Sequence, residues 1–173
     1  MAGDKTFVFG YEESYGCLIS DCVRDKDAVQ AAMMLCEATT HYNSLGITLI
    51  DALEALYQKY GFFLDALDNF TFKGLDGAEK IKALVNGLRE NPPAKAGTIN
   101  VLEMEDYQSP KMLEAGFPRS NVLRFMLKDG SWVAVRPSGT EPKCKFYFSV
   151  VADTRDAAER KLDDMRATFE KDC

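Results

Sequence analysis

The sequence is poor in the residues that build metal and disulfide sites. Among its 173 residues there is a single histidine, His41, which excludes a site made of several histidines. The cysteines are five, an odd number, and none stands at the C-x-x-C spacing of zinc and redox motifs. This pattern predicts reduced thiols in a cytosolic protein, without a disulfide framework or a zinc site.

The sequence also lacks an excess of basic charge and any long apolar run. With 21 Lys and Arg against 27 Asp and Glu, the net charge of −6 excludes general binding to nucleic acid, so an anion site must be local. The opening MAGDKTFVFG is not a signal peptide, and no apolar run reaches the length of a membrane span. We therefore expect a cytoplasmic protein with no membrane partner. Its length suits one domain or two small ones.

Residues 1–61 predict too few strands for a self-sufficient sheet. The expected elements are strands at 7–9 and 17–19, a helix from an Asp25 cap to about Tyr42, and a helix from Thr48 to Gly61. Asp51 stands three residues after Thr48, as in a capping box. The order β-β-α-α is interpreted as the back half of a partial α/β domain.

Residues 62–173 predict an α+β domain that is complete in itself, in the order β-α-β-β-β-β-α. The expected elements are a strand at 62–73, a helix from Asp76 to the Asn91-Pro92-Pro93 break, a strand at 98–106, a loop to about 121, strands at 122–127 and 132–136, a strand after 142, and a helix from Thr154. Asp129-Gly130 marks a two-residue hairpin turn. Cys144, Phe146, Phe148 and Val150 alternate onto one face, and Ala158, Leu162, Met165 and Phe169 follow a helical period. The sheet should be antiparallel, with two helices.

The stretch VAVRPSGTEPKCKFYF, residues 133–148, is unusually cationic for a turn in an acidic protein. Arg136 offers a fork of donors for two phosphate oxygens, and Gly139 allows a close approach of the backbone. Hydroxyls come from Ser138 and Thr140, and alternation places Lys143 and Lys145 on one face. The motif predicts an anion-binding loop, with phosphate as the favoured ligand. The alternative is a solvated turn whose cations balance charge.

RPSGTEPKCKFYF resembles the phosphate-binding loop in the last domain of the α-D-phosphohexomutases, the phosphoglucomutase/phosphomannomutase superfamily. GYEESYG, residues 10–16, resembles the sugar-binding loop of that family, written GE-x-S. The resemblance implies that Glu12 and Ser14 bind the sugar hydroxyls at C3 and C4. Tyr11 and Tyr15 replace glycines that are common in the pattern. VRDKDAV, PRSNVLRFMLKDGSW and KFYF resemble the phosphoglucomutase-like branch.

GYEES alone would indicate an exposed acidic turn. In an extended segment, however, Glu12 and Ser14 lie on one side of the chain, which suits two adjacent hydroxyls. The resemblance implies that residues 1–61 are the C-terminal part of domain 3, and that residues 62–173 are domain 4 with a TATA-binding-protein-like fold. The implied ligands of the substrate phosphate are Arg136, Ser138, Gly139, Thr140 and Lys145.

Neither the phosphoserine loop of the family nor its D-x-D-x-D-R magnesium loop occurs in the sequence. We expect a C-terminal portion without catalytic or metal-binding residues, inactive alone, whose missing partners are domains 1 and 2 of the same enzyme. The resemblance implies that the intact enzyme is an intramolecular phosphotransferase. It interconverts hexose 1-phosphate and hexose 6-phosphate through a phosphoserine and a hexose 1,6-bisphosphate, with Mg²⁺. Glucose or mannose as substrate stays open, as does a stand-alone module that binds a phospho-ligand.

Overall fold

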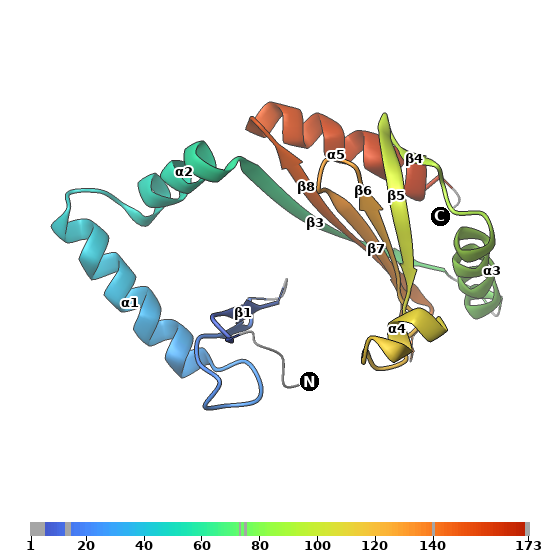
Figure 1. Cartoon of the computed structure of the whole chain (residues 1–173), viewed down its shortest axis with the longest axis horizontal. Helices are drawn as coiled ribbons and strands as arrows, with labels where there is room; N and C mark the ends of the chain where they lie inside the picture. Colours follow the sequence, from blue (N-terminus) through green and yellow to red (C-terminus); the bar gives the residue numbers. More distant parts are fainter. Residues whose placement is uncertain (1–5, 13–14, 73, 75, 140, 172–173) are drawn as a thin grey trace. The chain divides into compact units, whose positions relative to one another are not determined.

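The computed structural model describes residues 6–12, 15–72, 74, 76–139 and 141–171 of the chain. Its contacts divide the chain into two compact units, Met1–Tyr60 and Gly61–Cys173, which we call unit 1 and unit 2. Figure 1 traces both. In the part of the chain that is described, no helix is long and apolar enough to cross a membrane.

Unit 1 consists of a short two-stranded ribbon and two helices. The elements are β1 (Gly10–Tyr11), β2 (Cys17–Leu18), α1 (Ala28–Ser44) and α2 (Leu49–Tyr60), and β1 pairs antiparallel with β2. The strand expected at 7–9 is wrong, because the pairing begins only at Gly10. The ring of Phe9 instead stacks on Tyr11, with 5.9 Å between the ring centroids.

The helix caps of unit 1 confirm one prediction and correct another. Thr48 and Asp51 form the expected capping box: the Thr48 N–H donates to Asp51 Oδ2 (2.8 Å), and the Asp51 N–H donates to Thr48 Oγ1 (3.1 Å). Asp25 does not cap α1. Its carboxylate accepts from the N–H of Lys26, whereas Asp27 accepts from the N–H groups at the start of α1. The helix therefore starts later than expected.

Unit 2 is built on one antiparallel sheet. Its elements are β3 (Phe62–Thr71), α3 (Gly77–Glu90), β4 (Lys95–Ala96), β5 (Ile99–Asp106), α4 (Pro110–Glu114), β6 (Leu123–Leu127), β7 (Trp132–Pro137), β8 (Lys143–Ala152) and α5 (Arg155–Phe169). The strand order is β3-β8-β7-β6-β5-β4. The α+β class with an antiparallel sheet is confirmed. The strand β4 was not predicted. The helix α4 was not predicted either, so the expectations of two helices in this domain and of an irregular loop after residue 106 are wrong.

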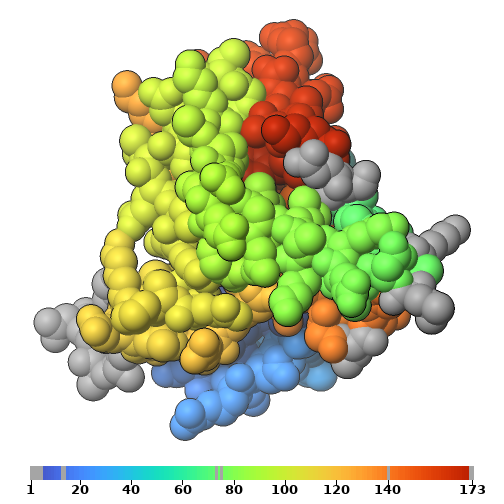
Figure 2. Space-filling view, turned by 90° about the vertical axis from the view of Figure 1, so that its right-hand side faces the viewer, coloured from blue at the N-terminus to red at the C-terminus, as the bar shows by residue number. Residues whose placement is uncertain are grey.

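The core lies on one face of the sheet, beneath α3 and α5 (Figure 1). The predicted alternation of β8 is confirmed, because Cys144, Phe146, Phe148 and Val150 are all buried. The predicted inner residues of α5 are buried as well: Ala158, Leu162, Met165 and Phe169. Figure 2 shows the outer surfaces of these helices, with α3 in green and α5 in red. We call the sheet face opposite α3 and α5 the outer face.

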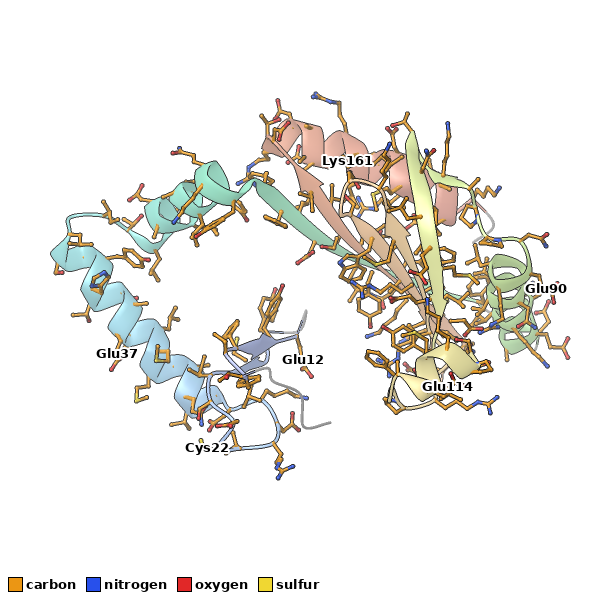
Figure 3. The ribbon with its side chains drawn as sticks, viewed as in Figure 1. Glu12, Cys22, Glu37, Glu90, Glu114 and Lys161 are labelled. Atoms are coloured by element: carbon orange, nitrogen blue, oxygen red, sulfur yellow. The ribbon has the colours of Figure 1, made fainter. Side chains whose placement is uncertain are left out.

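The β6–β7 hairpin has a longer turn than the two-residue turn expected. The Gly130 N–H donates to the carbonyl of Leu127 (3.2 Å), and the Leu127 N–H donates to the carbonyl of Ser131 (2.9 Å). Gly130 has a φ of +87°, the left-handed region in which glycine closes a three-residue loop. Lys161 of α5, labelled in Figure 3, ties this turn to the helix through Asp129 (2.7 Å).

Candidate functional site: an anion-binding loop and an acidic turn

The loop between β7 and β8 is shaped by its own hydrogen bonds. The Ser138 N–H donates to the carbonyl of Lys143 (2.8 Å), and the Lys143 N–H donates to the carbonyl of Glu141 (2.7 Å). The Glu141 N–H donates to Ser138 Oγ (3.3 Å). The N–H of Ser138 is therefore used to close the loop. Thr140, a predicted phosphate ligand, lies outside the described residues.

Two predicted phosphate ligands are brought together on the outer face. Arg136 of β7 and Lys145 of β8 are direct partners in the register of the two strands. Both alternate with buried residues, so both lie opposite the core. Like charges directly across a strand pair repel, and an anion placed over them removes that repulsion. The side chain of Arg136 is exposed and makes no hydrogen bond or ion pair with any described residue.

Gly139 has open space where a Cβ would stand, with no heavy atom within 4 Å. The chain itself does not use this space, so a ligand can approach the backbone there. Lys143 is committed elsewhere, because its Nζ lies 3.2 Å from the Glu141 carboxylate. This ion pair offsets the one acidic charge of the described loop. Lys143 therefore adds less to the positive charge of the site than its position in the motif suggests.

The start of α3 supports the loop from behind. The Phe72 N–H donates to the carbonyl of Pro142 (2.9 Å), and a Cβ on Gly77 would lie 2.3 Å from the Phe72 carbonyl oxygen. Only glycine permits this close approach. A cleft of about 230 Å³ separates α3 from the loop, and its lining includes Lys82, Asn121, Ser138 and Gly139. A larger groove between α3 and α5 contains none of the predicted site residues.

A hydrogen-bonded cluster that the sequence did not suggest lies beside this cleft. Arg89 donates from Nε to Asp106 Oδ2 (2.8 Å), from Nη1 to Asn86 Oδ1 (2.9 Å) and from Nη2 to Asn121 Oδ1 (2.8 Å). It thereby joins α3 to β5 and to the segment that leads into β6. The partners of Arg89 lie up to 32 positions from it in the sequence, and no motif marks them. The cluster holds in place the side of the cleft that faces the loop.

In unit 1, the acidic turn between β1 and β2 is held in a tight conformation. The Glu12 N–H donates to the carbonyl of Gly16 (2.7 Å), and Tyr15 has a φ of +69°. A Cβ on Gly16 would lie 2.9 Å from both Glu12 Oε2 and Lys26 Cδ, so a larger residue would displace both side chains. Ser14, the second predicted sugar ligand, lies outside the described residues.

Glu12 has a cationic partner that sequence reasoning did not assign. Lys26 Nζ lies 3.1 Å from Glu12 Oε1, and Figure 3 labels Glu12 at the end of the ribbon. The hydrogen bond to Glu12, followed by that to Asp25, raises the pKa of Lys26. The pair is exposed, so both side chains are open to a polar ligand. The spacing of 14 residues gives no signal in the sequence.

The described residues do not fit a metal ion. No group of three or more His, Cys, Asp or Glu residues gathers among them. Cys17, Cys22, Cys36 and Cys144 are free thiols.

Family models of known proteins match both units. Residues 78–167 match the phosphoglucomutase/phosphomannomutase C-terminal domain, and residues 1–60 match the phosphoglucomutase/phosphomannomutase alpha/beta/alpha domain III. The chain belongs to the phosphoglucomutase/phosphomannomutase family.

Several relatives are named phosphoglucomutase. One from Staphylococcus haemolyticus (strain JCSC1435) is 40% identical over 157 residues, 86% of this chain and 28% of the relative. One from Staphylococcus aureus (strain bovine RF122 / ET3-1) is 37% identical over 169 residues, 93% of this chain and 30% of the relative. The chain therefore spans less than a third of the length of these relatives.

A solved structure shares the fold. The open form of the exocytosis-sensitive phosphoprotein pp63/parafusin, a phosphoglucomutase from Paramecium, has a TM-score of 0.64 to this chain at 19% identity. The similarity covers 91% of this chain and 29% of that protein.

Proposed function

We propose that this chain is the substrate-binding C-terminal part of a phosphoglucomutase. In this role it binds a hexose phosphate, while the phosphoryl group is transferred by a phosphoserine elsewhere in the intact enzyme through a hexose 1,6-bisphosphate. The observation that carries the proposal is the pairing of Arg136 with Lys145 on the outer face, beside the loop of Ser138 and Gly139. The resemblance of that loop to the family's phosphate-binding loop agrees with it.

The residues have separate tasks in this proposal. Arg136, Lys145, Ser138, Gly139 and Thr140 hold the phosphate that is not reacting, by charge and by hydrogen bonds. Glu12 and Ser14 bind sugar hydroxyls, with Lys26 orienting the Glu12 carboxylate. Binding of this kind positions the substrate and supplies no covalent chemistry. Since the described residues form no metal cluster, we assign the Mg²⁺ of the family no ligands here.

We further propose that residues 1–61 are the end of the third domain and residues 62–173 the fourth domain, with a TATA-binding-protein-like fold. The relatives named phosphoglucomutase support glucose as the hexose. There are two alternatives: phosphomannomutase activity with the same mechanism, and a stand-alone module that binds a phospho-ligand. Cytoplasmic location fits the free thiols of the described cysteines.

The test uses the full-length enzyme that contains this chain. Arg136→Ala should lower kcat/KM for glucose 1-phosphate about 100-fold or more, because a charge-assisted bidentate contact is lost. Arg160→Ala is the matched control, since Arg160 is an exposed arginine of α5 on the other side of the sheet. An unchanged kcat/KM in Arg136→Ala would overturn the assignment of the loop. The 173-residue chain alone should show no turnover with Mg²⁺ and glucose 1,6-bisphosphate, and turnover would contradict the proposed division of labour.

A further inference from the structure

One more polar side chain stands in line with the two cations of the outer face. Lys145 of β8 pairs with Arg136 of β7 on one side and with Asn69 of β3 on the other. The side chains of Asn69, Lys145 and Arg136 therefore form a row across neighbouring strands. Adjacent strands lie about 4.8 Å apart, so an anion above Lys145 has Arg136 and Asn69 each about one strand spacing away.

The direction of Asn69 follows from its neighbour in the sequence. Asp68 points to the helix side, where Arg166 of α5 donates to it from Nε (2.7 Å) and Nη2 (3.1 Å). Successive side chains of a strand point to opposite faces, so Asn69 points to the outer face. Its side chain is exposed and makes no hydrogen bond with any described residue. Its amide is available to a ligand.

The charges around the row favour an anion. On one side, the next outer-face row consists of Leu67, Tyr147 and Ala134, which carry no charge at neutral pH. On the other side, Lys143 pairs across the strands with Thr71. The nearest acidic side chain of β3 on this face, Asp65, lies four residues along the strand from Asn69, at roughly 13 Å.

We propose that Asn69 is a further ligand of the phosphate monoester, donating from its amide to the phosphate group held over Lys145 and Arg136. This inference rests on the proposed function of the loop. It extends the phosphate site from β7 and β8 to the neighbouring strand β3. An amide also accepts hydrogen bonds, which neither cation can do, so Asn69 suits the end of the ligand where a phosphate meets sugar hydroxyls. Its role is binding, and no bond is made or broken by it.

The experiment is a titration of the 173-residue chain with glucose 1-phosphate and with inorganic phosphate, followed by amide NMR shifts. Asn69→Ala should weaken the binding of glucose 1-phosphate about tenfold, the loss of one hydrogen bond to a charged group. Asn69→Asp should weaken it further by repulsion, and Asn69→Lys should tighten it. Asn100→Ala, an exposed asparagine of β5, is the matched control and should bind as the parent chain does.

We expect the affinity for glucose 1-phosphate to fall in the order Lys, Asn, Ala, Asp at position 69. Equal affinities in Asn69→Ala and Asn69→Asp overturn the inference. Arg136→Ala, measured in the same way, separates this inference from the proposed function. If Arg136→Ala abolishes binding while every variant at position 69 binds normally, the loop binds phosphate without Asn69. If Arg136→Ala binds normally, the proposed function itself is wrong.

Discussion

The helices α1 and α2 of unit 1 are richer in apolar residues than α3 and α5 of unit 2, yet unit 1 buries far fewer of them. Among the described residues, the buried apolar side chains of unit 1 consist of Ala52 alone, whereas those of unit 2 extend from Phe62 to Phe169. In α1, Val29 is 79% exposed and Leu35 is 59% exposed. A hydrophobic period thus marks a helix, but burial follows only where a second layer is present. Unit 2 has such a layer in its sheet.

The largest expected effect is in the core of unit 2. Phe146→Ala should lower the free energy of unfolding by about 3–5 kcal/mol, because it opens a cavity beneath α5. Leu35→Ala in α1 should change it by less than about 0.5 kcal/mol. Urea unfolding followed by the fluorescence of Trp132, the single tryptophan, reports on unit 2, and circular dichroism covers both units. A comparable loss in Leu35→Ala would show that unit 1 has a core of its own.

The next effect is the pH dependence of the stability of unit 2, which we attribute to Glu170. Burial raises the pKa of Glu170 to about 7, and the hydrogen bond to Asp68 and the charge of Asp68 act in the same direction, while Arg166 opposes them. Glu170 Oε1 is buried without a hydrogen-bond partner. Other charges here are those of Asp163 and Arg166, whose side chains lie 3.7 Å apart.

The sign follows from the two states. The folded chain keeps a proton on Glu170 that the unfolded chain, with an ordinary pKa of 4.5, has already released. The stabilisation is complete below pH 4.5 and is lost as the pH rises through 7. After allowance for solvent screening, we expect a loss of about 1 kcal/mol between pH 5 and pH 8. Glu170→Gln should remove this part of the pH dependence, as chemical unfolding at both pH values will show. An identical pH dependence in the variant would contradict the assignment.

The smallest effect compares equivalent helix caps in the two units. Thr48 Oγ1 accepts from the Asp51 N–H (3.1 Å) in α2, and Thr154 Oγ1 accepts from the Ala157 N–H (3.3 Å) in α5. Either change to alanine should destabilise its helix by about 1 kcal/mol. Thr154→Ala should lower the global stability of unit 2, whereas Thr48→Ala should only speed amide exchange within α2. If Thr48→Ala lowers the global free energy of unfolding as much as Thr154→Ala does, the contrast between the two units is wrong.

The parts of the fold that could be predicted from the sequence are those in which a single physical rule, burial of apolar side chains, determines the structure. The alternation of β8 and the period of α5 depend only on which side chains face the core, and both were predicted correctly. The helix α4 was missed although Ser109 caps it and Pro110 is its first residue. These two residues are equally common in turns, so five helical residues could not be distinguished from a loop.

The site was predictable where it is continuous in the sequence. Arg136 and Lys145 stand in one motif, and their pairing follows from the hairpin that joins β7 to β8. Lys26 and the cluster around Arg89 depend on contacts between distant segments, which a single sequence does not reveal. The same holds for Asn69, whose neighbour Lys145 is on a strand more than 70 residues away.

The strand order of unit 2 has a consequence for its synthesis. β8 is the last strand of this sheet in chain order, yet it pairs with β3 on one side and β7 on the other. Until it emerges, β3 and β7 each have an unpaired edge, and the cations of Arg136 and Lys145 are not yet opposed. The sheet therefore cannot be assembled progressively from the N-terminal side, and the long sequence separation of its paired strands favours slow folding. The proposed anion site is complete only when β8 has paired, because Arg136 lies on β7 whereas Lys145 belongs to β8.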